Sequence, residues 1–280
     1  MIQYLNRRLI EVSSVRSYVW RIGRRLYCLA RRDYANDPKS NGEYWLLEKI
    51  LSACQGEKNI VFLDIGANIG EWSKRALMGF KTHSISGQLV AFEPARATFE
   101  SLSTRFAHER QIMCKNIALS SSSRESDFHV IKPLAGINSL HPQEGASIEK
   151  VQCKTLDEIL VEEGISHVTF AKCDTEGHDM KVLIGSEHAL NDGRIDCFQF
   201  EYNHRWILSR NFLRDVFDFV SDKPYSLGKL YGCGIELYDH WHPELERFFE
   251  TNFILLRRNS DIERLSCRAY FDVHNVATSL

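Results

Sequence analysis

Short apolar runs that end in an acidic residue recur along the middle of the chain. Residues 60–63 read Ile-Val-Phe-Leu, and residues 89–92 read Leu-Val-Ala-Phe, with similar runs within 168–173 and 195–200. Unbroken apolar runs of this length are typical of strands buried on both faces of a parallel sheet. The acids that follow the four runs are Asp64, Glu93, Asp174 and Glu201. The pattern predicts an α/β fold with these acids at the carboxyl ends of its strands.

Helical spacing of apolar residues fills the stretches between these runs. The expected helices cover residues 44–51, 70–79, 95–107, 180–184 and 212–220, and another helix begins at Thr155. Further strands are expected within residues 111–119, 127–131 and 151–154, and residues 225–238 and 252–256 form a closing hairpin. Residues 132–147 form a long irregular loop, and loops of this length are often functional.

The turn after the first apolar run carries Gly66, Asn68 and Gly70 at every second position. Glycine adopts positive φ without strain and lets a ligand approach the backbone, and asparagine tolerates the left-handed region better than most residues. A strand, a tight turn and a helix N-terminus together present free backbone N–H groups. Glu93, at the tip of the next strand, can accept both hydroxyls of a ribose. These two features predict a nucleoside-binding pocket.

The spacing of this turn argues against a dinucleotide. The dinucleotide fingerprint is G-x-G-x-x-G, whereas the turn reads G-x-N-x-G and is followed by Glu71. The stretch from Asp64 to Gly70 resembles the first motif of class I S-adenosylmethionine (SAM) methyltransferases, and more narrowly that of the FkbM family. Other stretches similar to this family are Asn116-x-Ala-Leu, Asn138-Ser-Leu, Thr155-Leu-Asp-Glu and Lys172-x-Asp174-x-Glu176-Gly.

The resemblance covers about residues 58–257 and implies a Rossmann-like three-layer sandwich preceded by N-terminal helices. Its sheet would have seven strands, mostly parallel, with an antiparallel last strand. The resemblance implies SAM as the cofactor and a hydroxyl of a sugar, glycan or secondary metabolite as the methyl acceptor. The residues it implies for cofactor binding are Asp64, Gly66, Asn68, Gly70, Glu93 and Asn116. The same resemblance places Asn138 and Ser139 beside the pocket.

Methyl transfer to an alcohol requires an oriented acceptor and a group that takes its proton. The candidates for this catalytic role, all near strand tips, are Asp174, Glu176, His178 and His204. A divalent metal is the other route, because it can polarise the hydroxyl as a Lewis acid. Asp174, Glu201 and Asn203 offer the hard oxygen ligands that Mg²⁺ prefers. The sequence leaves both the base and the metal dependence open.

The distribution of charge along the chain limits the partners that can be expected for this protein. Residues 1–32 hold eight Arg and one Glu, a net +7, so the remainder holds 27 basic and 36 acidic residues, a net −9. An acidic catalytic domain is a poor match for nucleic acid, so no such partner is expected.

Eight cysteines without C-x-x-C spacing indicate reduced thiols and no zinc site. No apolar run approaches the roughly 20 residues that span a bilayer, and no secretory signal is evident, so a cytoplasmic location is expected.

The N-terminal segment combines an apolar helical stripe with arginines and aromatic residues. The stripe over residues 3–32 comprises Leu5, Leu9, Val12, Val15, Val19, Ile22, Leu26 and Leu29. Such a helix can lie peripherally on an anionic membrane surface, here the inner face, or pack on its own domain or on a second copy. We therefore divide the chain into residues 1–41 (basic helix and linker), 42–258 (methyltransferase domain) and 259–280 (C-terminal tail).

Two other functions fit parts of the pattern. A nicotinamide-dependent oxidoreductase would share a strand–turn–helix with a following acidic strand tip. A non-catalytic module would keep a vestigial SAM pocket and use residues 3–32 to attach to membranes or partners. The sequence favours the SAM-dependent O-methyltransferase over both.

Overall fold

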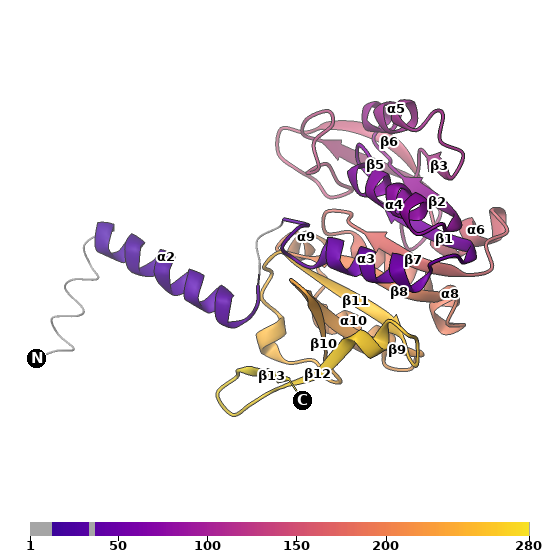
Figure 1. The fold of residues 1–280 in the computed structure, drawn as a ribbon. Coiled ribbons are helices and arrows are strands. Elements are labelled where there is room, and N and C mark those ends of the chain that lie inside the picture. Colours follow the sequence, from indigo (N-terminus) through magenta and orange to yellow (C-terminus); the bar gives the residue numbers. More distant parts are fainter. Residues whose placement is uncertain (1–12, 34–36, 280) are drawn as a thin grey trace, which may run out of the picture.

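The apolar runs of the sequence form the centre of a ten-stranded sheet (Figure 1). The computed structural model describes residues 13–33 and 37–279. The strands lie in the order β13-β12-β10-β9-β11-β8-β7-β1-β2-β3. Their bounds are β1 Lys58–Ile65, β2 Ser86–Phe92, β3 Ile112–Lys115, β7 Val168–Cys173, β8 Ile195–Tyr202, β9 Tyr225–Tyr231, β10 Gly234–Leu237, β11 Thr251–Arg257, β12 Ser266–Phe271 and β13 Ala277–Ser279.

Seven neighbouring strands reproduce the expected core of the sheet. β3, β2, β1, β7 and β8 run parallel to one another, and β11 lies antiparallel between β8 and β9. The prediction of a mostly parallel sheet with an antiparallel last strand is therefore confirmed. The main sheet extends beyond seven strands, because β10 pairs with β9, β12 pairs with β10, and β13 pairs with β12. β12 and β13 come from residues 259–280, the stretch expected to form a tail.

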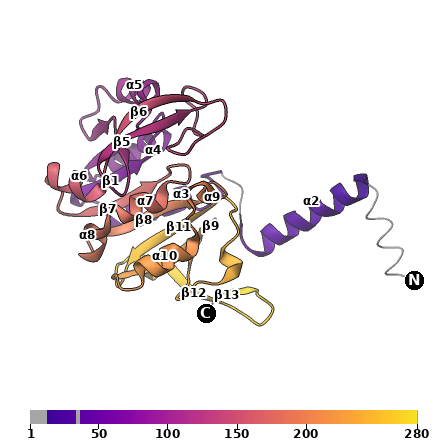
Figure 2. The same ribbon diagram turned by 180° about the vertical axis from the view of Figure 1, so that it is seen from behind.

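Helices cover both faces of the sheet, so the three-layer prediction is confirmed. The helices are α2 Ser13–Ala30, α3 Glu43–Ala53, α4 Glu71–Thr82, α5 Arg96–Arg105, α6 Leu156–Glu162, α7 Asp179–Ile184, α8 Glu187–Asn191, α9 Trp206–Ser209 and α10 Leu213–Val220, with short 3-10 turns η1 Pro243–Leu245 and η2 Glu263–Leu265. Apolar residues of α3 and α4 pack on one face, seen in Figure 1. Those of α6, α7, α8 and α10 pack on the other face, seen in Figure 2. β7 between these layers is buried along its whole length, as its continuous apolar run requires.

A second, three-stranded sheet was not expected from the sequence. It consists of β4 Ala118–Leu119, β5 Arg124–Val130 and β6 Ser147–Lys154 in the order β4-β6-β5. The stretch 111–119, expected to hold one strand, instead splits into β3 and β4. Between them the Asn116 amide donates to the carbonyl oxygens of Glu93 and Pro94, at 2.9 Å each. This pairing holds the chain beside the β2–α5 turn, and the residues after it join β6 instead of continuing the main sheet.

The N-terminal helix α2 extends away from the rest of the molecule in both views (Figures 1 and 2). Of the stripe expected over residues 3–32, Leu5, Leu9 and Val12 lie outside the described residues. Within residues 13–33 and 37–279, no helix is both long and apolar enough to cross a membrane.

The capping box expected at Thr155 is confirmed and allows a test of the fold. The Glu158 N–H donates to Thr155 Oγ1 at 3.1 Å, and Glu158 Oε2 accepts from the Thr155 N–H at 3.3 Å. Replacing Thr155→Ala should lower the free energy of unfolding by about 1 kcal/mol, because an N–H of the first turn of α6 loses its partner. Urea denaturation measures this change. Thr104→Ala, at an exposed position of α5, is the control and should stay within about 0.5 kcal/mol of the parent. Equal stability of the two variants would contradict the assigned cap.

Candidate functional site

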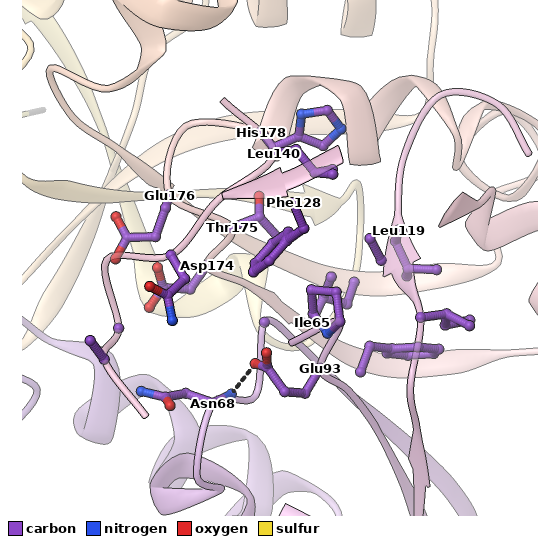
Figure 3. A pocket seen from close by; sticks show the side chains of 18 residues that line it. Ile65, Asn68, Glu93, Leu119, Phe128, Leu140, Asp174, Thr175, Glu176 and His178 are labelled. Atoms are coloured by element: carbon purple, nitrogen blue, oxygen red, sulfur yellow. Dashed lines mark hydrogen bonds between the residues drawn. The ribbon is translucent and has the colours of Figure 1, made fainter. Parts of the chain in front are cut away.

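A cavity opens at the carboxyl ends of β1, β2 and β7 (Figure 3). One part of its lining is polar and comprises Asn68, Glu93, Asn138, Asp174, Thr175, Glu176 and His178. The other part is apolar and comprises Ile65, Phe92, Pro94, Ile117, Leu119, Phe128 and Leu140. Phe128 and Leu119 come from the second sheet, so this unexpected sheet supplies a wall of the cavity. A mixed polar and apolar lining of this kind is typical of a small-molecule site.

The turn after β1 has the backbone conformation that its sequence predicts. Gly66, Asn68 and Gly70 have φ of 81°, 49° and 79°, all in the left-handed region. A Cβ on Gly66 would lie 2.0 Å from the backbone oxygen of Asp174, so only glycine fits there. Gly70 begins α4 and lies outside the cavity lining, where a Cβ would meet the ring of Phe106 at 2.5 Å.

Glu93 crosses from the tip of β2 to the turn after β1. Its Oε2 accepts from the Asn68 N–H at 3.0 Å, and its Oε1 accepts from the Ala95 N–H at 2.9 Å (Figure 3). Burial raises the pKa of Glu93 from 4.5 to about 7, although the two backbone N–H groups act in the opposite direction. Asn68 Oδ1 is buried with no hydrogen-bond partner, so it can accept a hydrogen bond from a ligand.

Asp64 does not line the cavity but belongs to a buried polar cluster beside it. Its Oδ2 accepts from the Ser73 hydroxyl at 2.6 Å, and burial raises its pKa while Lys172 lowers it. Lys172 Nζ lies 3.2 Å from Asp174 Oδ2. Burial opposes the charge on Lys172, but the carboxylates of Asp174, Glu43 and Asp64 outweigh it and raise the pKa of the lysine. The cluster therefore holds Lys172 charged next to the site.

Asn116, another predicted cofactor residue, also lies outside the lining and instead supports the loop that carries Glu93.

Asp174 and Glu176 follow β7 and face the turn of β1 across the cavity (Figure 3). The Asp174 side chain is 39% exposed, although Lys172 lies beside it. Glu176 has a positive φ of 58° and forms an ion pair with Arg205, which leaves its side chain 15% exposed. Of these two acids, Asp174 is therefore the one that a ligand can reach more freely.

His178 ends the polar wall and is buried among groups that the sequence did not single out. Its Nε2 lies 3.0 Å from the Ser120 hydroxyl, and its ring centroid is 5.5 Å from that of His141. His141 in turn bonds the Gly177 carbonyl oxygen through Nε2 at 3.1 Å. Burial, aided by His141, lowers the pKa of His178 to about 3, so the ring is neutral at physiological pH. His141 lies in the irregular loop 132–147, whose length was the one sequence signal for it.

The remaining predicted site residues lie apart from this cavity. His204 lines a separate hollow against α2, together with Phe248 and Phe249. Asn203 Nδ2 donates to Glu201 Oε2 at 2.6 Å, and Asn203 Oδ1 accepts from the Arg205 N–H at 2.8 Å. The Asn203 oxygen is therefore used within the protein.

Nothing in the described part of the chain supports the expected Mg²⁺ site. There, no group of three or more His, Cys, Asp or Glu side chains is arranged to hold a metal ion. Asparagine is not one of these residue types, so the proposed set of Asp174, Glu201 and Asn203 stays a prediction without support.

The solved structures that this chain resembles include three whose titles name a methyltransferase, each at low identity. The METTL16 methyltransferase domain is 11% identical with a TM-score of 0.45, covering 77% of this chain and 66% of that one. Precorrin-6y C5,15-methyltransferase from Geobacter metallireducens GS-15 is 12% identical with a TM-score of 0.38, covering 77% and 88%. SMU.1697c from Streptococcus mutans, solved in complex with SAH, is 8% identical with a TM-score of 0.43, covering 80% and 99%.

Family membership rests on the sequence itself. None of the curated proteins matches this chain. The Methyltransferase FkbM domain matches residues 64–243, a range that begins at Asp64 and includes the whole lining of the cavity. Because this match covers more than half of the chain, the protein belongs to the FkbM methyltransferase family.

Proposed function

We propose that this methyltransferase takes its methyl group from SAM and transfers it to a hydroxyl of a sugar, glycan or secondary metabolite. The observation that carries the proposal is the Glu93 carboxylate, held across the turn of β1 by the Asn68 and Ala95 N–H groups. When bound, SAM supplies a methyl group on a positively charged sulfur. The oxidoreductase alternative is set aside, because the family to which the chain belongs is one of methyltransferases.

The two parts of the cavity suit the two chemical parts of an adenosyl ligand. Each Glu93 oxygen accepts one backbone N–H and keeps a further lone pair, so the carboxylate can also accept the ribose hydroxyls. The apolar wall with Phe128 and Leu119 offers a surface on which a purine can stack. The unpartnered Asn68 Oδ1 can accept from an ammonium group of the methionyl part. Asp174 and His178, on the remaining wall, would then face the methyl acceptor.

Asp174 is the residue we assign to the acceptor hydroxyl. It is the most exposed of the three ionisable groups on its wall, with 39% exposure against 15% for the Glu176 side chain and 6% for His178. A carboxylate at this position can accept the hydroxyl hydrogen bond and take the proton as the methyl group transfers. Glu176 is neutralised by Arg205, and His178 is only 6% exposed, so an acceptor reaches neither of them as readily as Asp174. Both then shape the wall around Asp174.

Removing the Glu93 carboxylate should weaken SAM binding. Glu93→Ala is expected to raise the Kd for SAM on the order of 10- to 100-fold, because charge-assisted hydrogen bonds to the ribose are lost. Isothermal titration calorimetry measures this change. Glu100→Ala removes an exposed carboxylate of α5 and is the matched control. Unchanged affinity in Glu93→Ala would remove the assignment of the ribose site.

The affinity for SAM should also depend on pH through Glu93. Its pKa in the folded protein is raised to about 7, so the carboxyl is mostly protonated below that pH. Because the ribose hydroxyls need an ionised acceptor, the affinity should fall about tenfold per pH unit as the pH drops below about 7. Above this pH the affinity should level off. Calorimetry over this range with Glu93→Gln separates the effect from titration of SAM itself, since that variant should lack the slope. A slope of equal size in both proteins would contradict the role of Glu93.

Asp174→Asn should separate methyl transfer from cofactor binding. Loss of the base is expected to slow transfer by about 10²- to 10⁴-fold, while the Kd for SAM stays within a few-fold. Transfer is measured as labelled methyl incorporated from SAM into small molecules of a cell extract, with mass spectrometry to identify the acceptor. Asp127→Asn, on β5 outside the cavity, is the control. Full activity of Asp174→Asn would exclude the assigned role, and SAM binding without transfer by the parent protein would favour the non-catalytic alternative.

A further inference from the structure

Helix α2 contacts the domain through its polar side, although the apolar side of an amphipathic helix normally packs on the domain. The domain side, formed by Arg24, Tyr27 and Arg31, is spaced by three and four residues and so lies on one face. The Arg24 guanidinium lies 5.0 Å from the ring centroid of Phe249, and the Arg31 guanidinium bonds Glu244 at 3.3 Å. Cationic and aromatic side chains therefore attach this helix to the segment that follows β10.

The apolar stripe of α2 points the other way and has no partner in the described part of the chain. We define the stripe as Val15, Val19, Ile22, Leu26 and Leu29, which recur every three or four residues. At about 100° per residue, the stripe is centred on the face opposite the domain side. Val19, Ile22, Leu26 and Leu29 are 43–67% exposed. The helix extends away from the domain in both views, so nothing of the domain covers this face (Figures 1 and 2).

Arginines flank the stripe, and the helix carries no acid. Arg16 and Arg25 are exposed beside it, and residues 13–30 contain no Asp or Glu. A second copy of this helix would bring like charges together along both flanks, without the acidic partners that paired helices use. An anionic lipid surface instead satisfies both features, because it buries the apolar stripe and attracts the arginines.

We propose that α2 docks this protein on an anionic membrane surface, with the stripe in the lipid and the domain side toward the protein. An 18-residue helix is about 27 Å long, which suits a helix that lies in the interface plane. Tyr18, which lies beside the stripe, is 68% exposed, and aromatic residues of this kind favour the membrane–water interface. This docking holds the methyltransferase domain beside the membrane. The inference does not depend on which methyl acceptor the enzyme uses.

Flotation of the full chain with vesicles tests the proposal. The protein should float with vesicles of phosphatidylcholine and phosphatidylserine but not with phosphatidylcholine alone, and salt should reduce the binding. Arg16→Gln with Arg25→Gln should reduce partitioning about 25-fold, since each arginine near an anionic surface contributes about fivefold. Arg96→Gln with Arg264→Gln removes the same charge from exposed sites on α5 and η2, 82% and 78% exposed, and should leave partitioning unchanged.

A second pair of variants tests the apolar stripe. Ile22→Ser with Leu26→Ser should reduce partitioning about tenfold or more, because apolar burial in the interface is lost. Val161→Ser with Val273→Ser changes exposed apolar residues outside α2, at 75% and 93% exposure, and should have no effect. Thermal unfolding followed by circular dichroism should be unaltered in all four double variants, since none of the replaced side chains contacts the core.

Two results would overturn the proposal. The first is absence of the parent protein from the floated anionic vesicles. The second is a dimer in sedimentation velocity that Ile22→Ser with Leu26→Ser dissociates while vesicle binding is absent, because the stripe would then pair with a second copy. Equal flotation with neutral and anionic vesicles would reject the part assigned to the arginines.

Discussion

The close contact between the turn after β1 and the end of β7 is the constraint on which the site depends. The position of a Gly66 Cβ lies 2.0 Å from the Asp174 backbone oxygen, so the two strand ends touch only because residue 66 has no side chain. The contact is supported by the hydrogen bond from the Asp174 N–H to the Ile65 carbonyl oxygen at 2.9 Å. It sets the distance across the cavity between the turn that carries Asn68 and the wall that carries Asp174. Any larger residue at position 66 would separate these two walls.

The polar groups behind this contact control the charge of the site. Lys172 is surrounded by Glu43, Asp64 and Asp174, and burial keeps water from screening them. One buried cation among three acids stays protonated, whereas burial pushes Glu43 and Asp64 toward the neutral form. Asp174, the member of this cluster that reaches the cavity, thereby has a charged lysine fixed beside it. On the other side of the cavity, burial raises the pKa of Glu93, against the effect of the Ala95 and Asn68 N–H groups.

The structure also places Glu176 and His204, both catalytic candidates from the sequence, at two different surfaces. Glu176 lines the cavity and pairs with Arg205, whereas His204, the residue next to Arg205, lines a separate hollow. His204 therefore belongs with α2 and the aromatic residues Phe248 and Phe249 instead of with the proposed chemistry. Attachment of α2 to the same segment links the proposed membrane contact to the side of the domain that carries His204.

By itself the sequence determined the parallel core of the sheet, the left-handed turn with Gly66 and Asn68, and the placing of Glu93 and Asp174 at strand ends. These features are local: unbroken apolar runs, glycine at positive φ and an acid after each run have few alternative interpretations. Only the tertiary structure decided that Asp64 and Asn116 lie outside the cavity lining. Side chains at the ends of neighbouring strands can point into different layers of the fold, so their position in the sequence does not decide whether they face the cavity. The tertiary structure likewise decided that His141 and Phe128 approach the site and that the stripe of α2 faces away from the domain. Contacts between distant segments decide these placements, and no local pattern records which segments will meet.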